Sequence, residues 1–325
     1  MNIIYACDET YIPILYVSIK TLIKNNADAL INIYIVGDHV TAESKKLINS
    51  LCTSLNNIIW MPFMNIEEEI GSKVKLDRGS YAQFARIFIG RMLPKNIKKI
   101  LYLDCDTMIK ASIIQLWETD LKQYSFAACL DAFSPLYSKN LGLNKDADLI
   151  NSGVLLINMD RWRSQDYERK AIKILRTRKG KIQQADQGLL DILCQNDLLI
   201  LNPMFNCING YFEFSYPEWL KYRRPNKNYR LVYTQSVIET ASKTPIIIHF
   251  TSSFLGNRPW IDESQHPFKT EWLDELGSYK RFLRTSSKSI FLKNLFYFLP
   301  RSISIIIFGI LQAYIRPIFS KLGDS

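Results

Sequence analysis

The sequence has 325 residues but only 13 glycines, and it lacks both common glycine-rich phosphate loops. No GxGxxG follows the first apolar run, and no GxxxxGK(S/T) occurs anywhere in the chain. Dinucleotide-dependent oxidoreductases and P-loop nucleotide hydrolases depend on these loops, so they are excluded as first hypotheses. Long apolar runs are missing too. The uncharged stretch at 302–315 has 14 residues, fewer than the roughly 18–20 that span a bilayer.

Paired cysteines are also absent. Six cysteines occur singly, without the CxxC spacing of zinc sites, and most lie in apolar runs such as 5–7 and 127–129. Isolated thiols in apolar surroundings favour a reducing compartment over a disulfide framework. The first eight residues follow a strand pattern, without the basic segment and apolar core of a signal peptide. We therefore expect a cytoplasmic protein.

Acidic residues are nearly missing from the C-terminal part. Residues 279–325 contain eight Lys or Arg and one Asp, so they carry +7 of the total charge of +10. A nucleic-acid-binding body would need this excess on its folded part, so we expect no nucleic-acid partner. Two apolar segments, 291–299 and 303–315, lie among these cations. The combination predicts a helical tail that lies on an anionic membrane surface. A C-terminal helix packed on the core is the alternative.

Short apolar runs alternate with longer amphipathic stretches, a pattern typical of parallel strands covered by helices. We expect strands at 3–7, 31–36, 58–62, 99–103, 125–130, 154–159 and 245–250. We expect helices at 12–25, 42–55, 81–92, 162–178 and 186–194. The predicted fold is a single Rossmann-like α/β domain over residues 1–278, followed by the basic, hydrophobic tail over residues 279–325.

Polar residues collect where the predicted strands end, which is the edge at which α/β sheets bind ligands. Asp104 and Asp106 follow the strand at 99–103, and their spacing places both carboxylates on one side of an extended segment. Two such oxygen ligands can hold a divalent cation. His249 follows the apolar run 246–248, and as a third ligand it would favour Mn²⁺ over Mg²⁺. A hydrogen-bonded structural histidine is the alternative.

Several motifs, in order, resemble glycosyltransferase family 8, closest in plan to the bacterial retaining α-galactosyl- and α-glucosyltransferases that build lipopolysaccharide or lipooligosaccharide. The resemblance runs from about residue 2 to residue 260. It implies a GT-A fold, a UDP-sugar donor, and Mn²⁺ or Mg²⁺ held by Asp104, Asp106 and His249. The segment 6–11 resembles the uridine-contacting segment, in which Tyr11 would stack on uracil and Asp8 would bind the base.

The resemblance implies further donor contacts. Arg86, in the segment 80–86, would reach the sugar and the diphosphate. The segment 249–260 resembles the family's closing motif, with Ser252 at the first glycine position and Arg258 in place of lysine. A guanidinium can still clamp a phosphate. The full set of donor-binding candidates is Ala6, Asp8, Thr10, Tyr11, Arg86, Asp131, Asn151, Gly153, Gly256 and Arg258.

Asp186 and Gln187 resemble the pair that lies below the anomeric carbon, and they are the predicted catalytic residues. The resemblance implies retention of anomeric configuration. Because Gln187 is a poor nucleophile, we favour a front-face reaction in which the departing UDP oxygen helps to deprotonate the acceptor. The predicted function is metal-dependent transfer of galactose or glucose from UDP to a glycan or glycolipid acceptor. It would take place at the inner face of the cytoplasmic membrane.

Two other hypotheses remain. The segment 104–107 also fits the nucleophile motif of haloacid-dehalogenase-type phosphatases, although that fold normally starts with this strand and about a hundred residues precede it here. The other hypothesis is a peripheral membrane adaptor without activity. Five residues that would carry an activity are all present, which argues against this hypothesis. They are Asp104, Asp106, Asp186, Gln187 and His249.

Overall fold

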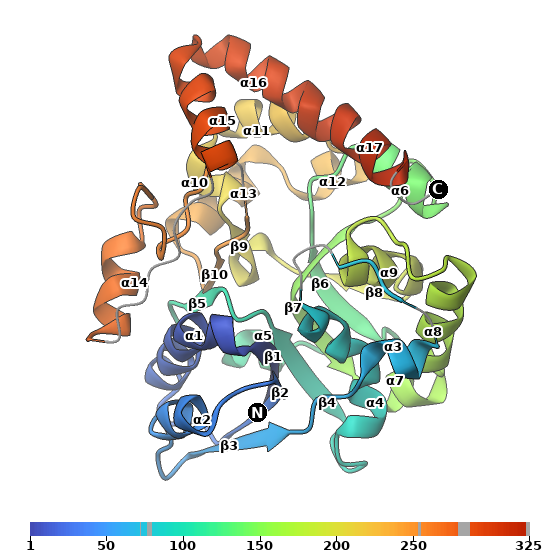
Figure 1. Cartoon of the computed structure of the whole chain (residues 1–325), viewed down its shortest axis with the longest axis vertical. Coiled ribbons are helices and arrows are strands. Elements are labelled where there is room, and N and C mark those ends of the chain that lie inside the picture. The colour runs from blue at the N-terminus through green and yellow to red at the C-terminus, as the bar shows by residue number, and fades with distance from the viewer. Residues whose placement is uncertain (72, 77–79, 253–254, 279–286, 323–325) are drawn as a thin grey trace.

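A mixed sheet of seven strands forms the centre of the protein, with strand order β3-β2-β1-β4-β7-β6-β8 (Figure 1). The computed structural model describes residues 1–71, 73–76, 80–252, 255–278 and 287–322. The strands of this sheet are β1 (Asn2–Asp8), β2 (Ile31–Asp38), β3 (Asn56–Met61), β4 (Lys99–Leu103), β6 (Phe126–Leu130), β7 (Ile150–Asn158) and β8 (Leu198–Ile200). A second sheet contains β5 (Thr107–Ile109), β10 (Ile247–His249) and β9 (Cys207–Ile208), in that order.

Helices surround both sheets. In the first half these are η1 (Glu9–Tyr11), α1 (Ile12–Lys24), α2 (Ala42–Asn49), α3 (Ile66–Ile70), η2 (Tyr81–Phe88), α4 (Ile89–Met92), α5 (Ile114–Trp117) and α6 (Pro135–Leu141). The middle contains α7 (Met159–Ser164), α8 (Tyr167–Thr177), α9 (Ala185–Leu193), η3 (Pro203–Phe205), α10 (Gly210–Glu213), α11 (Tyr216–Arg223), α12 (Lys227–Val232) and α13 (Gln235–Lys243). The last part contains α14 (Lys269–Leu276), α15 (Ser287–Phe298), α16 (Arg301–Ile310), the π-helical turn η4 (Leu311–Ile315) and α17 (Arg316–Leu322).

The direction of β7 differs from the prediction of parallel strands. Strands β1 to β4 are parallel to one another where they pair, but β7 runs antiparallel to both β4 and β6. In the register of β4 and β7, Leu103 lies opposite Val154, and the Asp104 N–H donates to the Gly153 carbonyl over 2.8 Å. The beginning of β7 therefore lies beside the end of β4, at the ligand-binding edge of the sheet.

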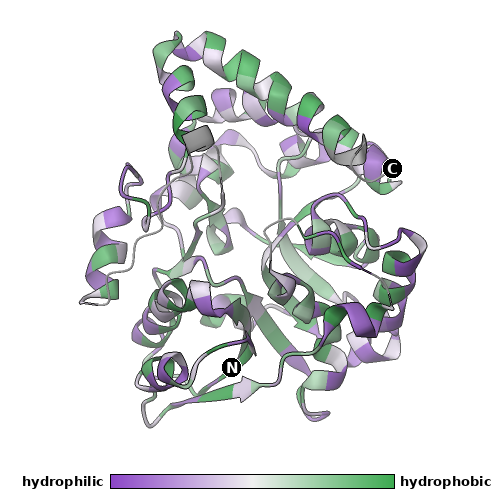
Figure 2. Cartoon of the chain, viewed as in Figure 1, coloured by the Kyte–Doolittle hydropathy of each residue, from purple (hydrophilic) through white to green (hydrophobic). Residues whose placement is uncertain are grey.

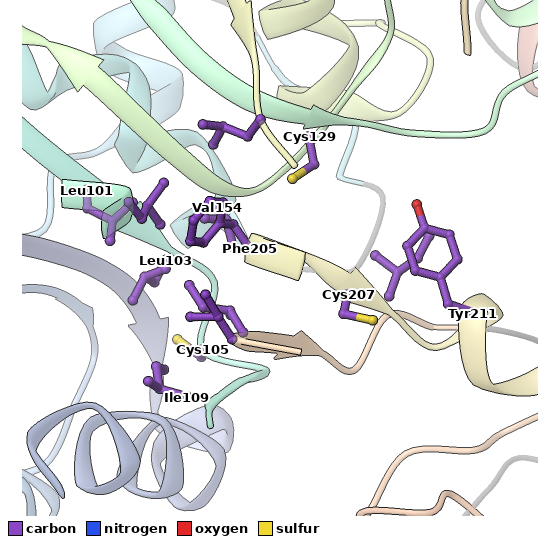
Figure 3. Packing of buried hydrophobic residues seen from close by; sticks show 14 of the residues in the cluster. Leu101, Leu103, Cys105, Ile109, Cys129, Val154, Phe205, Cys207 and Tyr211 are labelled. Atoms are coloured by element: carbon purple, nitrogen blue, oxygen red, sulfur yellow. The ribbon is translucent and has the colours of Figure 1, made fainter. Parts of the chain in front are cut away.

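Two apolar clusters fill the two faces of the large sheet. One joins α1 and the helices α10 to α13 to the inner residues of β1, β2 and β4, and Figure 3 shows its centre around Leu103 and Val154. The other packs η2, α4 and α7 to α9 on the opposite face. All six cysteines are free; five are buried in the interior, and Cys52 is exposed. The expectation of unpaired thiols is thus confirmed.

Three helix predictions are wrong in detail. The helix predicted at 81–92 is the 3₁₀ helix η2 followed by the short helix α4. The helix predicted at 42–55 ends at Asn49, because a turn leads into β3: the Thr53 N–H donates to Asn56 Oδ1, and Asn56 Nδ2 donates to Thr53 Oγ1. The single helix predicted at 162–178 is two helices, α7 and α8. Asp166 separates them with a left-handed backbone, φ 56°, which a continuous helix cannot contain.

The C-terminal helices pack on the body of the protein. Figure 1 shows α16 running along α11, and α17 reaching α6. Phe296, Ile305 and Phe308 are buried in the same apolar cluster as Phe214 and Trp219. Each fully buried side chain of this size contributes about 1.5–3 kcal/mol. The inner face of these helices is thus a part of the core. The boundary predicted at 278/279 stays a prediction, and Lys280, Arg281 and Arg284 lie outside the described residues.

The outer face of the same helices is apolar and exposed, as the green outer side of α15 and α16 in Figure 2 shows. Phe291, Phe298 and Phe319 are 66%, 85% and 69% exposed. The segment Arg301–Phe319 is one helix of 19 residues that is long and apolar enough to cross a membrane by length and composition, and 33% of it is buried against the protein. The described helix is longer than the uncharged stretch of the sequence because it continues past Arg316.

Candidate active site

A cavity opens at the carboxyl ends of β1 and β4 and brings most of the predicted site residues together. It is lined by Ala6, Asp8, Tyr11, Arg86, Asp104, Asp106, Asn151, Asp186, Gln187 and His249, among others. These residues are up to 243 positions apart in the sequence, so the fold alone assembles them. Of the remaining candidates, Asp131 lines a neighbouring cavity, whereas Thr10, Gly153, Gly256 and Arg258 line neither.

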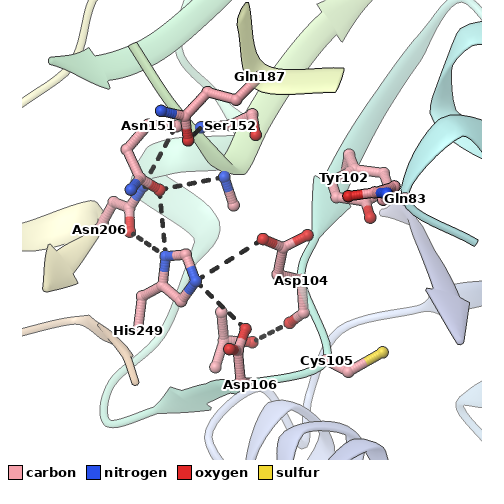
Figure 4. Close-up of polar contacts among 12 residues, drawn as sticks. Gln83, Tyr102, Asp104, Cys105, Asp106, Asn151, Ser152, Gln187, Asn206 and His249 are labelled. Carbon is pink, nitrogen blue, oxygen red and sulfur yellow. Dashed lines mark hydrogen bonds and ion pairs between the residues drawn. The ribbon is translucent and has the colours of Figure 1, made fainter. Parts of the chain in front are cut away.

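Asp104, Asp106 and His249 form a cluster whose ligand atoms all lie within 4.8 Å of one another. His249 Nε2 lies 3.6 Å from Asp104 Oδ2 and 3.2 Å from Asp106 Oδ1 (Figure 4). The small sheet produces this geometry, because β10 pairs with β5 and places His249 opposite Thr107. Asp106, the residue before Thr107, is thereby carried next to the imidazole.

The hydrogen bonds of His249 leave Nε2 free to act as a ligand. Its Nδ1 lies 3.1 Å from Asn151 Oδ1 and 3.0 Å from Asn206 Oδ1. Asn151 Oδ1 also accepts the Gly153 N–H and an N–H of Asn206, which fixes both amides with their oxygens toward the ring. Nδ1 must then carry the proton, and the lone pair is on Nε2.

Nε2 is buried and has no hydrogen-bond partner among the described residues. An unpartnered imidazole nitrogen that faces two carboxylates is the arrangement of a metal ligand, with its second nitrogen held by an outer amide. Two carboxylate oxygens and one imidazole nitrogen suit Mn²⁺. The residues present therefore fit the divalent cation expected from the sequence.

Asn206 was not recognised in the sequence, because a single asparagine after η3 carries no motif. Replacing it by Ala should weaken Mn²⁺ binding by about 10–100-fold, since the substitution removes one of the two oxygens that orient the His249 ring. Titration of the protein with Mn²⁺, followed by electron paramagnetic resonance, measures this change. Asn202→Ala is the matched control, because Asn202 only caps η3. Equal Mn²⁺ affinities of wild type and Asn206→Ala would contradict the orienting role.

Gly153 lies directly against the cluster. A Cβ added there would be 2.1 Å from His249 Cε1, 2.5 Å from its Nδ1 and 3.0 Å from Asp104 Oδ2. The family resemblance placed Gly153 among the residues that would contact the donor. The close neighbours that the structure describes are the imidazole and the carboxylate of the cluster, so glycine is required for the packing of the predicted ligands.

Arg86 is buried beneath the cavity and ties the two acidic parts of the site together. Its guanidinium donates to Asp104 Oδ1 and to Tyr102 OH, both at 2.8 Å, and to the Ser152 carbonyl at 2.7 Å. Its Nε lies 3.1 Å from Asp186 Oδ2. Burial alone would lower the pKa of Arg86, but the charges of Asp186, Tyr102 and Asp104 raise it above its ordinary value. The arginine stays charged and compensates both carboxylates.

The backbone before α9 is strained where the predicted catalytic pair begins. Gln184 and Ala185 have φ values of 65° and 50°, although neither is glycine. Gly188 follows, and a Cβ there would come within 2.0 Å of the Gln183 carbonyl. Consecutive left-handed residues cost about 1–3 kcal/mol each and persist where packing imposes them. This turn directs Asp186 and Gln187 into the cavity, where Gln187 Oε1 accepts the Ser152 N–H over 3.4 Å.

Three of the other donor-binding candidates, Thr10, Gly256 and Arg258, support neighbouring residues or the loop and do not line the cavity. Thr10 donates through its N–H and its hydroxyl to Asp8, which caps η1, so Thr10 lies behind Asp8. Arg258 donates to Asp106 Oδ2 over 3.2 Å, from a loop in which Gly256 has φ 65°. A side chain other than glycine would be strained at position 256. Arg258 thus reaches the site through a predicted metal ligand.

Asp131 accepts hydrogen bonds from two side chains, and its pairing with Arg223 could not be recognised in the sequence. Arg223 of α11 donates to its Oδ1 over 2.8 Å, and Asn151 donates to its Oδ2 over 3.2 Å. Burial would lower the pKa of Arg223, and the charge of Asp131 raises it. A lone arginine in a helix carries no sequence signal for such a role. Both residues line the neighbouring cavity, which extends away from the cluster.

Several relatives of the chain are named as glycosyltransferases. The profile of Glycosyl transferase family 8 matches residues 2–264. A Haemophilus influenzae protein named as a glycosyltransferase is 32% identical over 211 residues, which make up 63% of each chain. The chain thus spans slightly less than two thirds of that relative. The lipopolysaccharide 1,2-glucosyltransferase of Escherichia coli K12 is 24% identical over 271 residues, 82% of this chain and 75% of that protein.

Solved structures share the fold. The structure of the galactosyltransferase LgtC with donor and acceptor sugar analogues matches with a TM-score of 0.71 at 22% identity, over 86% of this chain and 96% of LgtC. The Rossmann-like GT-A fold predicted from the sequence is thereby confirmed. With the profile match over residues 2–264, the chain belongs to glycosyl transferase family 8.

Proposed function

We propose that the protein transfers a hexose, glucose or galactose, from UDP to a saccharide acceptor with retention of anomeric configuration. The observation that supports this most is the unpartnered Nε2 of His249 beside Asp104 and Asp106, at the edge of the sheet where α/β folds bind ligands. Asp104, Asp106 and His249 would hold Mn²⁺. A bound Mn²⁺ supplies positive charge for the phosphate oxygens of the departing UDP.

The other residues of the cavity would bind and orient the donor. Tyr11 and Asp8 lie at the end of β1, where the base would stack and be hydrogen-bonded. Arg86 keeps Asp104 in place through its 2.8 Å bond and adds positive charge below the sugar. Arg258 donates to Asp106 Oδ2 over 3.2 Å, and its guanidinium would add positive charge for a phosphate of the donor.

The ion pair of Asp186 with Arg86 supports the front-face reaction. A carboxylate that is paired with a buried arginine is a weaker nucleophile than an unpaired carboxylate. Asp186 would instead accept a hydrogen bond from a hydroxyl of the sugar. Gln187 would then stabilise charge on the sugar through its amide dipole. The acceptor proton would pass to the oxygen of the departing UDP.

A panel of UDP-sugars tests the proposal and identifies the donor. Wild-type protein is incubated with UDP-glucose, UDP-galactose and their N-acetylated counterparts, with and without Mn²⁺, and released UDP is measured. We expect release from one of the two hexoses, and only with the metal. Release of inorganic phosphate without UDP would instead support the phosphatase hypothesis. Release of neither product would support the inactive adaptor.

The acceptor would be a glycan or glycolipid at the inner face of the cytoplasmic membrane, in assembly of lipopolysaccharide or another surface glycan. One relative is named for lipopolysaccharide glucosylation, and the outer face of α15 to α17 offers apolar side chains. Lys and Arg near an anionic surface add on the order of 1 kcal/mol each. Because the inner face of these helices is buried in the body, the membrane would be contacted by one side of them.

Removing the exposed aromatic residues should weaken membrane binding without unfolding the protein. The triple variant Phe291→Ser, Phe298→Ser and Phe319→Ser should cosediment at least tenfold less with anionic liposomes, since each ring loses its apolar contact with lipid. Leu30→Ser is the control, because Leu30 is 71% exposed and lies before β2, outside the C-terminal helices. Unchanged cosedimentation of the triple variant would remove the membrane surface from the proposal. Truncation after Ser278 is less informative, because it also removes the buried Phe296 and Phe308.

A further inference from the structure

The cavity at the carboxyl ends of β1 and β4, which would bind the donor, is called the donor cavity below. A second cavity, of about 430 Å³, continues from the donor cavity toward the C-terminal helices. The two cavities share Asn151, Gln184, Gln187 and Thr251. In the proposed function, an acceptor hydroxyl must approach the anomeric carbon of the donor, so the acceptor needs room directly beside the donor cavity. The second cavity provides this room, and the residues around it would decide which acceptor fits.

Part of the wall of this cavity comes from the C-terminal helices. Gln312 and Arg316 both line it, one turn apart on the same face of the helix. Pro317 explains the local geometry, because it has no N–H to donate and its ring disfavours an α-helical carbonyl four residues earlier, at Ala313. The turn is π-helical, and Ser134 Oγ donates to the Ala313 carbonyl over 2.6 Å instead.

Two more hydrogen bonds fix this turn to the body. Tyr137 OH donates to the Gln312 carbonyl over 3.1 Å, and Asn140 Nδ2 donates to the Pro317 carbonyl over 2.9 Å. All three anchoring side chains come from α6 or its N-cap residue. Gln312 and Arg316 are therefore held at the cavity by several contacts, and the C-terminal helices belong to the site as well as to the surface.

Among the described residues at the second cavity, some charged side chains form ion pairs and Arg316 does not. Asp131 is paired with Arg223 over 2.8 Å. Glu213 lines the cavity, and its charge acts on Arg301, which does not line it and whose pKa is raised mainly by its hydrogen bond to Glu218. Arg316 donates to Gln312 Oε1 over 3.4 Å, and no carboxylate of the described residues forms an ion pair with it. Arg316 is thus the cation at this cavity that is available to a ligand.

A buried amide oxygen adds a second unmet hydrogen-bonding group. Asn209 is 1% exposed and lines the cavity. Its Nδ2 donates to the carbonyls of Thr251 and Asn257, at 3.0 and 2.8 Å. Its Oδ1 has no partner among the described residues. A buried acceptor without a donor is costly, and a sugar hydroxyl can supply that donor.

We propose that the second cavity binds an acceptor saccharide that carries a phosphate or carboxylate group, and that Arg316 and Gln312 of the C-terminal helix select it. A guanidinium matches both anions with two parallel hydrogen bonds. Asn209 would accept a hydroxyl of the same sugar. This proposal rests on the proposed function and adds a substrate class and two specificity-determining residues to it.

The test measures binding of matched neutral and anionic monosaccharides to the full chain by ligand-observed NMR. The probes are glucose, glucose 6-phosphate, glucuronate, galactose, galactose 6-phosphate and galacturonate. Saturating UDP and Mn²⁺ are present, so that the donor cavity is occupied and cannot bind the phosphate group. Binding of UDP and Mn²⁺ is measured in the same samples and tests the proposed function separately. Glycerol 1-phosphate is included as a probe for a lipid headgroup.

We expect at least one anionic sugar to bind at least tenfold more tightly than its neutral partner. Arg316→Gln should remove this preference, and Gln312→Ala should reduce it. Arg224→Gln is the matched control, because Arg224 lies over the Tyr314 ring beside the same helix but does not line the cavity. It should retain the full preference.

Equal binding of neutral and anionic sugars by the wild type, or an unchanged preference in Arg316→Gln, would overturn the proposal. Absence of any sugar binding would do the same. Glycerol 1-phosphate binding more tightly than every sugar would assign Arg316 to lipid headgroups, which also overturns it.

Discussion

Asp106→Asn is expected to lower UDP-hexose turnover at least about 10³-fold while the protein stays folded. Asp106 is almost fully buried, with Oδ1 3.2 Å from His249 Nε2 and Oδ2 3.2 Å from Arg258. Asn has the same size but no charge, so the substitution removes an anionic ligand while it keeps the packing. A loss of several kcal/mol of charge stabilisation in the transition state corresponds to this factor. Released UDP gives the rate, and circular dichroism confirms the fold.

Asp160→Asn is the matched control for this variant. Asp160 is an exposed residue of α7, away from the donor cavity, so the same change of chemistry there should leave turnover unchanged. If Asp106→Asn retained turnover within tenfold of the wild type, Asp106 would not hold the metal. The metal-site hypothesis would then be wrong.

Gly153→Ala should lower turnover at least about 10²-fold and reduce Mn²⁺ affinity, although it adds a single methyl group. That methyl would lie 2.1 Å from His249 Cε1, a distance that forces the imidazole to move. Extra volume in a packed site costs about 1–3 kcal/mol, so the melting temperature should fall by a few degrees. Activity, Mn²⁺ titration and thermal unfolding measure the three effects.

A double-mutant cycle identifies the clash partner. In a His249→Ala background the nearest neighbour of the new methyl group is gone, so Gly153→Ala should cost much less stability there than in the wild type. Equal losses of stability in both backgrounds would show that the substitution acts elsewhere. The close packing of Gly153 against His249 would then not be the cause of the lost stability.

Much of the fold could be predicted from the sequence, because most of its strands have five or more residues and leave a readable apolar pattern. The strand β10 has only three residues, but the run of three isoleucines at 246–248 marked it. The expected strands correspond to β1, β2, β3, β4, β6, β7 and β10. The strands β5, β8 and β9 have only two or three residues, too few to show alternation. The direction of β7 could not be predicted from the sequence either, since side chains alternate identically in parallel and antiparallel strands.

Part of the candidate site could also be predicted from the sequence, and part of it could not. Asp104 and Asp106 were predictable because two carboxylates directly follow an apolar strand, and the structure brings His249 to them as expected. Asn206 and Arg223 were missed, because their partners are 55 and 92 residues away and neither belongs to a motif. The position of Gln312 depends on Ser134 and Tyr137, more than 170 residues earlier. Such contacts appear only once the chain is folded.

The assignment of Asp104, Asp106 and His249 as ligands of a catalytic metal is tested most directly by Mn²⁺ titration of the full chain, with and without UDP, followed by electron paramagnetic resonance. We predict one bound Mn²⁺ per chain, tighter binding in the presence of UDP, and loss of this binding in Asp106→Asn. Absence of bound Mn²⁺ in the presence of UDP, or undiminished binding by Asp106→Asn, would contradict the assignment.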